Sequence, residues 1–133
     1  MFAWLRRLRR REELPLTGAP AVRRIKTYSA ASGYVYQYFY EGRRPAGRGM
    51  EYVFQVSADR RAYSSVAVTL DDEVLAAWQV AEARELSSSE RYGVAKMALF
   101  QAFDERPEPA RMREPIPVGL DDLARIADQL GLL

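Results

Sequence analysis

Tyrosine occupies every second position over residues 34–40, at Tyr34, Tyr36, Tyr38 and Tyr40. Alternate side chains of an extended strand share one face, so these rings are expected to form a single row. An exposed aromatic row can stack the bases of single-stranded nucleic acid while nearby arginines hold the phosphates. The arginines expected to supply this anion-binding surface are Arg23, Arg24, Arg43, Arg44 and Arg48. The alternative is half-buried packing, because tyrosine favours strands and only its hydroxyl needs water or a polar partner.

The N-terminal segment combines apolar and basic residues in a pattern that fits a short helix over residues 2–13. Such a helix can lie on an anionic membrane surface, inserting its apolar side while its arginines attract the lipid headgroups. The residues of this expected membrane-surface segment are Phe2, Trp4, Leu5, Arg6, Arg7, Leu8, Arg9, Arg10 and Arg11. The alternative is a solvated basic tail, or a helix packed on the domain.

Lys96 is an isolated cation within an otherwise apolar helical stretch, close to Tyr92, Phe100 and Phe103. Burial would lower the pKa of its ammonium group and make it a candidate nucleophile or base. The alternative is that the stem of the side chain packs while the ammonium group reaches solvent. We favour the second interpretation, because no partner group for catalysis is evident in the sequence.

The remaining inventory of reactive residues is small. The chain contains no histidine and no cysteine, which excludes a histidine-based triad, disulfides and a typical zinc site built from this chain alone. Its paired acids occur as Asp71–Asp72, Asp104–Glu105 and Asp121–Asp122. Neighbouring residues of a helix point about 100° apart, so these pairs are poorly placed to share a substrate. Metal binding by carboxylates alone is the alternative, but the sequence has no EF-hand-like spacing. The sequence therefore predicts a non-enzymatic protein without a metal ion or cofactor.

Charge is unevenly distributed along the chain, although the net charge is only +2. Residues 1–61 carry 13 basic and 5 acidic side chains, whereas residues 62–133 carry 7 basic and 13 acidic ones. This asymmetry indicates either an anionic partner or head-to-tail self-association. No apolar run approaches the roughly 20 residues that a membrane span needs, so we expect a cytoplasmic location. A peripheral location at the inner face of the membrane is the alternative.

The pattern of the chain changes from strands to helices near residue 70. β-Branched and aromatic residues predict strands over 22–29, 34–41, 50–57 and 62–70, with an arginine-rich loop over 42–49. Helical periodicity and capping residues then predict helices over about 71–85, 87–105 and 120–130, with an extended connection over 106–118. Pro15, Gly18 and Pro20 indicate a linker, which divides the chain into a basic segment, 1–20, and one domain, 21–133.

These elements predict an α+β fold. A four-stranded antiparallel meander over about 22–70 is followed by three helices over about 71–131, packed on one face of the sheet. The stretch 92–103 is apolar on nearly all sides, which is typical of a helix that is central or covered by a partner. We therefore expect a protein-binding or self-association module, most simply a homodimer. The alternative is an adaptor for single-stranded nucleic acid or an anionic membrane.

Overall fold

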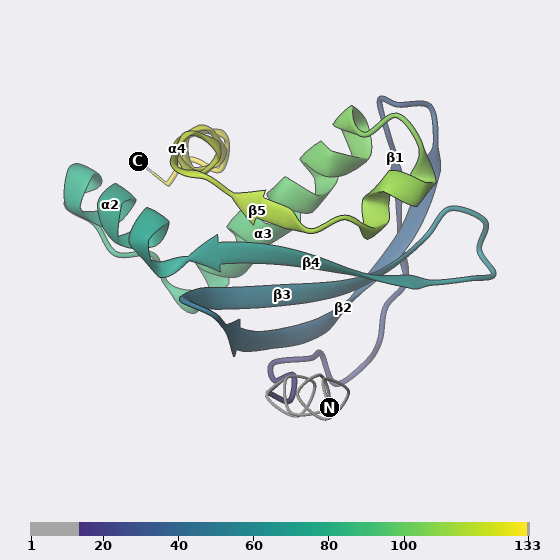
Figure 1. The fold of residues 1–133 in the computed structure, drawn as a ribbon, viewed down its shortest axis with the longest axis horizontal. Helices are drawn as coiled ribbons and strands as arrows, with labels where there is room; N and C mark the ends of the chain where they lie inside the picture. Colours follow the sequence, from purple (N-terminus) through teal and green to yellow (C-terminus); the bar gives the residue numbers. More distant parts are fainter. Residues whose placement is uncertain (1–13, 133) are drawn as a thin grey trace, which may run out of the picture.

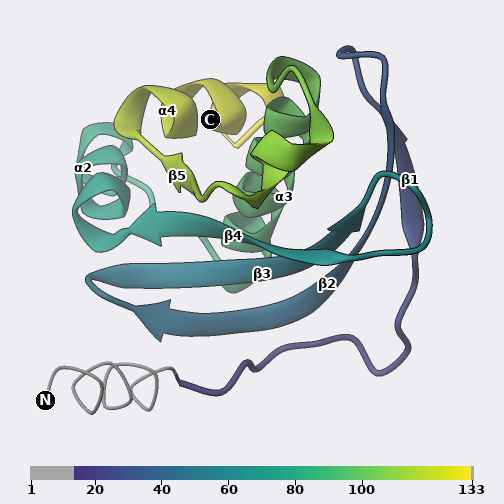
Figure 2. The same cartoon turned by 45° about the vertical axis from the view of Figure 1, so that its right-hand side comes forward.

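A curled β-sheet forms one layer of the molecule, and the helices lie within its curve (Figures 1 and 2). The computed structural model describes residues 14–132, so the helix predicted over residues 2–13 lies outside the described residues. The strands are β1 (Lys26–Ser29), β2 (Val35–Ala46), β3 (Gly49–Ser57), β4 (Ser64–Asp71) and β5 (Ile116–Val118). The predicted α+β class, a strand meander followed by three helices, is confirmed.

The sheet has five strands rather than the four that the sequence predicts, in the order β1-β2-β3-β4-β5. The first four strands form the expected antiparallel meander. The fifth strand lies within the proline-rich connection and pairs with β4 in parallel, with Val68 opposite Ile116 and Leu70 opposite Val118. Pro117 is tolerated there because β5 is an edge strand, where a missing N–H need not break the ladder.

The helices begin where the sequence provides capping groups. They are α2 (Asp72–Glu82), α3 (Ser88–Glu105) and α4 (Leu120–Gln129), with a short 3₁₀ helix, η1 (Pro109–Arg113), between α3 and β5. Ser87 and Glu90 form the predicted capping box of α3, because each side chain accepts a backbone N–H bond from the other residue. Asp71 caps α2 by accepting the N–H of Glu73 at 2.7 Å.

The arginine-rich loop predicted over 42–49 is mostly strand. β2 continues to Ala46, and only Gly47 and Arg48 lie between β2 and β3. The pairing register shifts between Tyr40 and Gly42, which marks a β-bulge. Gly42 adopts a φ of 131°, and a Cβ atom there would lie 2.7 Å from the backbone oxygen of Thr17. Glycine therefore permits both the bulge and the close approach of the segment that precedes β1.

The core lies between the curved sheet and α3. The strands supply Tyr36, Phe54 and Val66, none of which has any exposed surface. Helix α3 supplies Leu99 and Phe103, which are also fully buried. This helix contacts β4 and β5 on one side and α4 on the other. Its extensive apolar surface is therefore used within the chain, so that surface no longer favours a second copy as its cover.

Candidate functional site

The tyrosine row faces the helices and is a packing surface. Tyr36 has no exposed surface and Tyr38 only 5%. The ring of Tyr36 stacks on Phe103, with centroids 4.4 Å apart, and Tyr38 meets Phe100 edge to face at 5.5 Å. An open stacking platform built on Tyr36 and Tyr38 is therefore wrong, because α3 covers both rings. Only Tyr34, at the end of the row, is exposed, with 40% of its surface accessible.

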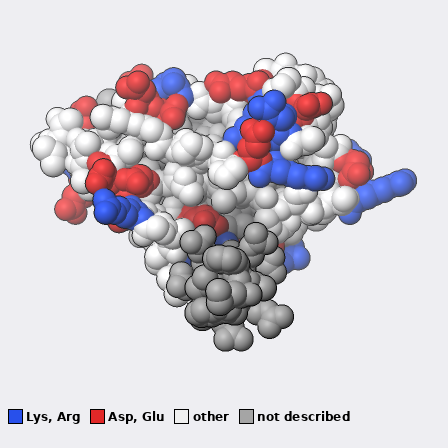
Figure 3. All heavy atoms as spheres, in the orientation of Figure 1, with Lys and Arg blue, Asp and Glu red and all other residues white. Residues whose placement is uncertain are grey.

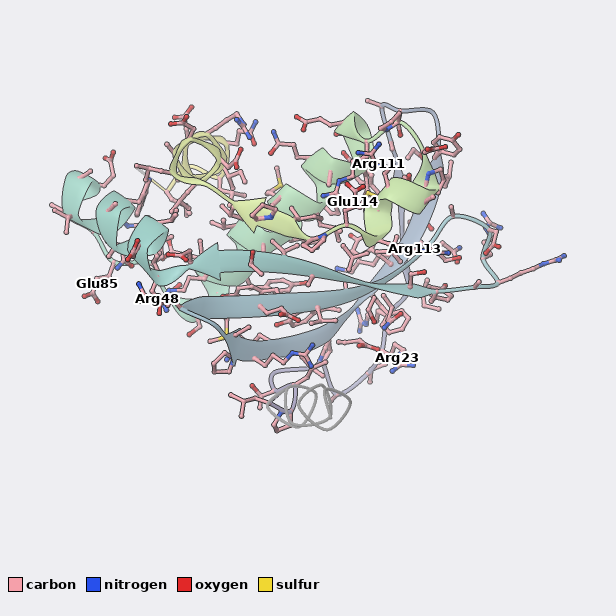
Figure 4. All side chains as sticks on the ribbon, in the orientation of Figure 1. Arg23, Arg48, Glu85, Arg111, Arg113 and Glu114 are labelled. Carbon is pink, nitrogen blue, oxygen red and sulfur yellow. The ribbon has the colours of Figure 1, made fainter. Side chains whose placement is uncertain are left out.

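The arginines proposed to accompany the row do not converge on one site. Arg44 pairs with Glu51 at 2.9 Å, and Arg48 approaches Glu73 at 3.6 Å. Arg23 lies over the ring of Phe39, 4.4 Å from its centroid. Figure 4 shows Arg23 and Arg48 on widely separated parts of the molecule. Basic and acidic side chains are interspersed on the face shown in Figure 3, which does not present a continuous basic surface.

The arrangement that does converge involves Lys26 and Lys96, the only lysines of the chain. Lys26 shares the helix-facing side of β1 with Tyr28, because alternate residues of a strand face the same way. Tyr28 stacks on Phe100 with centroids 4.5 Å apart, and Nζ of Lys96, on α3, lies 5.7 Å from the centroid of the same Phe100 ring, which places the two lysines in one region. Burial lowers the pKa of Lys96, and the neighbouring Lys26 lowers it further. We call these two residues the lysine pair.

A groove opens beside the lysine pair, between the segment 20–26, strand β2 and the first turns of α3. Its volume is about 430 Å³, which is within the range of ligand-binding pockets. Aromatic rings form much of its wall, and cations lie at its side. The lining residues, which define the cationic groove, are Pro20, Val22, Arg24, Lys26, Tyr38, Phe39, Tyr40 and Tyr92.

Further positive charge lies at the end of the groove formed by Tyr40 and Tyr92, whose rings are 4.7 Å apart. The Tyr40 hydroxyl is buried and has no hydrogen-bond partner among the residues that the structure describes. Burial raises the pKa of Tyr40, and the guanidinium group of Arg43 opposes that rise. Arg91 and Arg43 oppose a similar burial effect on the pKa of Tyr52. The guanidinium group of Arg43 thus adds to the positive potential beside Tyr40, at this end of the groove.

Two carboxylates lie close to this region, and neither neutralises the lysine pair. Asp104 accepts hydrogen bonds from the Tyr28 hydroxyl and the Ala31 N–H, both at 2.8 Å. Glu41 lines an adjoining cavity of about 450 Å³, together with Arg23. Among residues 14–132, no ion pair joins a carboxylate to Lys26 or Lys96. The lysine pair is thus two ammonium groups of like charge beside an aromatic wall.

This arrangement can hold an anion more readily than it can move protons. Two neighbouring cations repel each other, and an anion between them removes that repulsion. The lowered pKa also favours the neutral, nucleophilic form of Lys96, but among residues 14–132 no carboxylate pairs with Lys96 to serve as an acid or base. Within the described part of the chain, no cluster of three or more acidic side chains is placed to hold a metal ion. No described helix is both long and apolar enough to cross a membrane.

Sequence reasoning found one half of the lysine pair. Lys96 stands out because its helical neighbours are apolar, whereas Lys26 lies in an ordinary basic stretch far from it in the sequence. One signal was available, because two lysines among eighteen arginines form an unusual minority. Of the expected anion-binding residues, the groove contains Arg24, Tyr38 and Tyr40. The expected membrane-surface segment, Phe2–Arg11, lies outside the described residues.

Comparison with protein-family models, curated proteins and solved structures gives no match for this chain.

Proposed function

We propose that this domain is a non-enzymatic protein-binding module that holds an anionic segment of its partner in the cationic groove. The observation that carries the proposal is the lysine pair, in which Lys26 and Lys96 lie near Phe100 without a carboxylate partner among residues 14–132. A bound carboxylate would offset the repulsion between the two ammonium groups. The aromatic wall formed by Tyr40 and Tyr92 would contact the apolar part of the same ligand.

An acidic protein segment fits these observations better than a nucleic acid does. Non-specific binding of a single strand requires a row of cations along the backbone and exposed rings for the bases. Tyr36 and Tyr38 are buried, while Arg44 and Arg48 lie beside acidic residues. Lys26 and Arg24 instead line one groove, and Lys96 lies near Lys26. A groove of this kind suits a few carboxylates rather than a long polyphosphate chain.

The proposal can be tested by nuclear magnetic resonance on the full chain with ¹³C-labelled lysine. Because the chain has only two lysines, the spectrum contains only two sets of lysine signals. A hexaglutamate peptide should shift both sets, and an uncharged hexaglutamine peptide should shift neither. Lys26→Gln and Lys96→Gln should each weaken binding by roughly tenfold, equivalent to about 1.4 kcal/mol.

A matched control removes one positive charge elsewhere. Arg61 is exposed on the connection between β3 and β4, so Arg61→Gln should leave the affinity for hexaglutamate within about twofold. Absence of any lysine shift at low salt would remove the proposal. If an octathymidine oligonucleotide bound at the same lysines more tightly than hexaglutamate, the partner would be a nucleic acid rather than an acidic protein segment.

A further inference from the structure

Strand β1 leaves one edge of the sheet open. Among residues 14–132, it is first in the strand order and pairs only with β2. The Ala30 N–H donates to the backbone carbonyl oxygen of Tyr34 at 2.8 Å, which shows which residue pairs of β1 and β2 are hydrogen-bonded. Hydrogen-bonded and non-hydrogen-bonded pairs alternate in an antiparallel ladder, so Lys26 and Tyr28 direct their backbone groups toward β2. Thr27 and Ser29 therefore present their N–H and C=O groups outward, and both residues are exposed.

The two faces of this edge differ in chemistry. Lys26 lies on the helix-facing side, where Lys96 adjoins it. On the opposite side, alternation places Ile25 and Thr27, and Val35 lies on that same side of β2. Ile25 and Val35 are large apolar residues with 55% and 46% of their surfaces exposed. An added strand would thus meet cations on one face and apolar side chains on the other.

The charges around the edge restrict which strand can add to it. Arg23, Arg24 and Lys26 precede or begin β1, and all three are exposed. Basic residues on an edge strand disfavour pairing between two copies, because the like charges meet. The same residues favour a strand of opposite charge. Charge complementarity therefore points to an acidic strand rather than to a second copy of this chain.

We propose that an extended acidic segment of a partner protein adds to the free edge of β1 as a further strand, with its acidic side chains toward Lys26 and Lys96. This inference rests on the proposed function and specifies how the partner is recognised. Backbone hydrogen bonds to Thr27 and Ser29 supply the pairing, and side chains at alternate positions supply the specificity. Acidic residues on one face of the added strand meet the lysine pair. Small apolar residues on its other face meet Ile25 and Val35.

The probe is a labelled eight-residue peptide in which glutamate alternates with threonine and valine, measured by fluorescence anisotropy on the full chain. The control peptide has the same composition with its glutamates gathered at one end. We expect the alternating peptide to bind at least about fivefold more tightly, because only it directs every glutamate to one face of a strand. Equal affinities for the two peptides would overturn strand addition.

A backbone substitution tests the edge independently of charge. Thr27→Pro removes the outward N–H, which β1 does not use in pairing with β2. Thr27→Ala keeps that N–H and is the matched control. We expect Thr27→Pro to lower the affinity for the alternating peptide by tenfold or more, and Thr27→Ala to change that affinity by less than about twofold. Circular dichroism establishes that each variant is folded.

A second measurement does not depend on variants. Amide hydrogen exchange at Thr27 and Ser29 should slow on addition of the alternating peptide, because both N–H groups become hydrogen-bonded. Unchanged exchange at saturating peptide would overturn strand addition. If exchange were unchanged but Lys26→Gln and Lys96→Gln still lowered the affinity for the peptides, the proposed function would stand without strand addition. If hexaglutamate also failed to bind, the proposed function itself would fall.

The same set of experiments identifies a different occupant. If sedimentation of the free chain revealed a dimer that Thr27→Pro dissociated, a second copy would occupy the edge and the acidic segment would be overturned. If an octathymidine oligonucleotide displaced the alternating peptide and protected neither Thr27 nor Ser29, the partner would be a nucleic acid.

Discussion

Tyr28 on β1 donates a 2.8 Å hydrogen bond from its hydroxyl to Oδ2 of Asp104 on α3. The other oxygen of the same carboxylate accepts the Ala31 N–H at 2.8 Å. The Ser32 hydroxyl adds a third link between the β1–β2 turn and α3, donating to the Phe103 carbonyl at 2.8 Å. These contacts fix the edge strand against the helix and thereby hold the lysine pair together.

The first prediction concerns Asp104. Asp104→Ala should lower the free energy of unfolding by about 1–2 kcal/mol, because two hydrogen bonds to a charged acceptor are lost at a partly exposed position. Urea unfolding followed by circular dichroism measures the change. The neighbouring Glu105→Ala is the control and should change stability by less than about 0.5 kcal/mol. Equal effects of the two variants would show that Asp104 does not hold β1 to α3.

The second prediction concerns alkaline pH. Burial, aided by Asp104, raises the pKa of Tyr28 from 10.0 to about 12. Because the pKa is higher in the folded chain, the stabilisation is complete below pH 10 and is lost as pH rises through 12. We therefore expect the stability advantage of the unmodified chain over Tyr28→Phe to shrink between pH 10 and 12. Urea unfolding of both chains at a series of pH values measures it, and a constant difference would contradict the prediction.

The third prediction concerns Arg106, whose guanidinium group organises the connection between α3 and β5. Its Nη1 donates to the carbonyl oxygens of Arg111 and Glu114, both at 2.7 Å, and its Nη2 donates to that of Pro115 at 3.0 Å. Arg106→Ala should cost roughly 2 kcal/mol of folding stability, because three carbonyl groups lose a charged donor. Arg106→Lys should recover less than half, because an ammonium group cannot reproduce the planar fork. Thermal unfolding of both variants measures the losses, and full recovery by lysine would show that charge alone suffices.

The fourth prediction concerns the N-terminal boundary of the domain. Removal of residues 1–20 should leave one cooperative unfolding transition, because all the named strands and helices among the described residues begin after this segment. The truncation does remove a bridge in which Thr17 and Arg43 exchange two 2.8 Å backbone hydrogen bonds. We expect a loss of about 1–2 kcal/mol in urea unfolding. Loss of cooperative unfolding would show that the first 20 residues belong to the core.

The fifth prediction concerns Lys96. Burial and Lys26 lower the pKa of its ammonium group in the folded chain, so stability should rise with pH from this lowered pKa toward the ordinary value of 10.5. Addition of hexaglutamate should raise the pKa of Lys96, because a nearby anion favours the charged form. The pH dependence of the Lys96 ¹³Cε signal measures both states. An unchanged pKa at saturating peptide would place the bound anion away from this lysine.

The periodicity of the sequence predicted most of the secondary structure but not the assignment of the sheet faces. Ser87 and Glu90 form the capping box at the predicted start of α3. The sequence does not decide which side of the sheet the helices cover, because the face opposite the tyrosines also carries apolar residues such as Phe39 and Val53, both buried. When both faces of a sheet are apolar, hydrophobic alternation separates the two faces but does not show which of them the helices cover.

Two features were outside the reach of local patterns. β5 has only three residues and contains Pro117, so neither its length nor its composition indicates a strand. The lysine pair depends on β1 lying against α3, and no local pattern connects segments so distant in the sequence. Pairings of this kind are set by tertiary packing rather than by spacing.

The parallel pairing of β4 with β5 has a consequence for the order of events during synthesis. The first four strands fold back on one another through short connections, whereas β5, the second partner of β4, follows only after α2 and α3. Contacts between segments so far apart in sequence form slowly, because a long loop must close first. Until Ile116–Val118 leave the ribosome, the growing chain carries β4 as an unpaired edge that includes Val68 and Leu70. Before β5 is added, the sheet therefore has β4 as a second unpaired edge besides β1, at which a chaperone or a neighbouring nascent chain can bind.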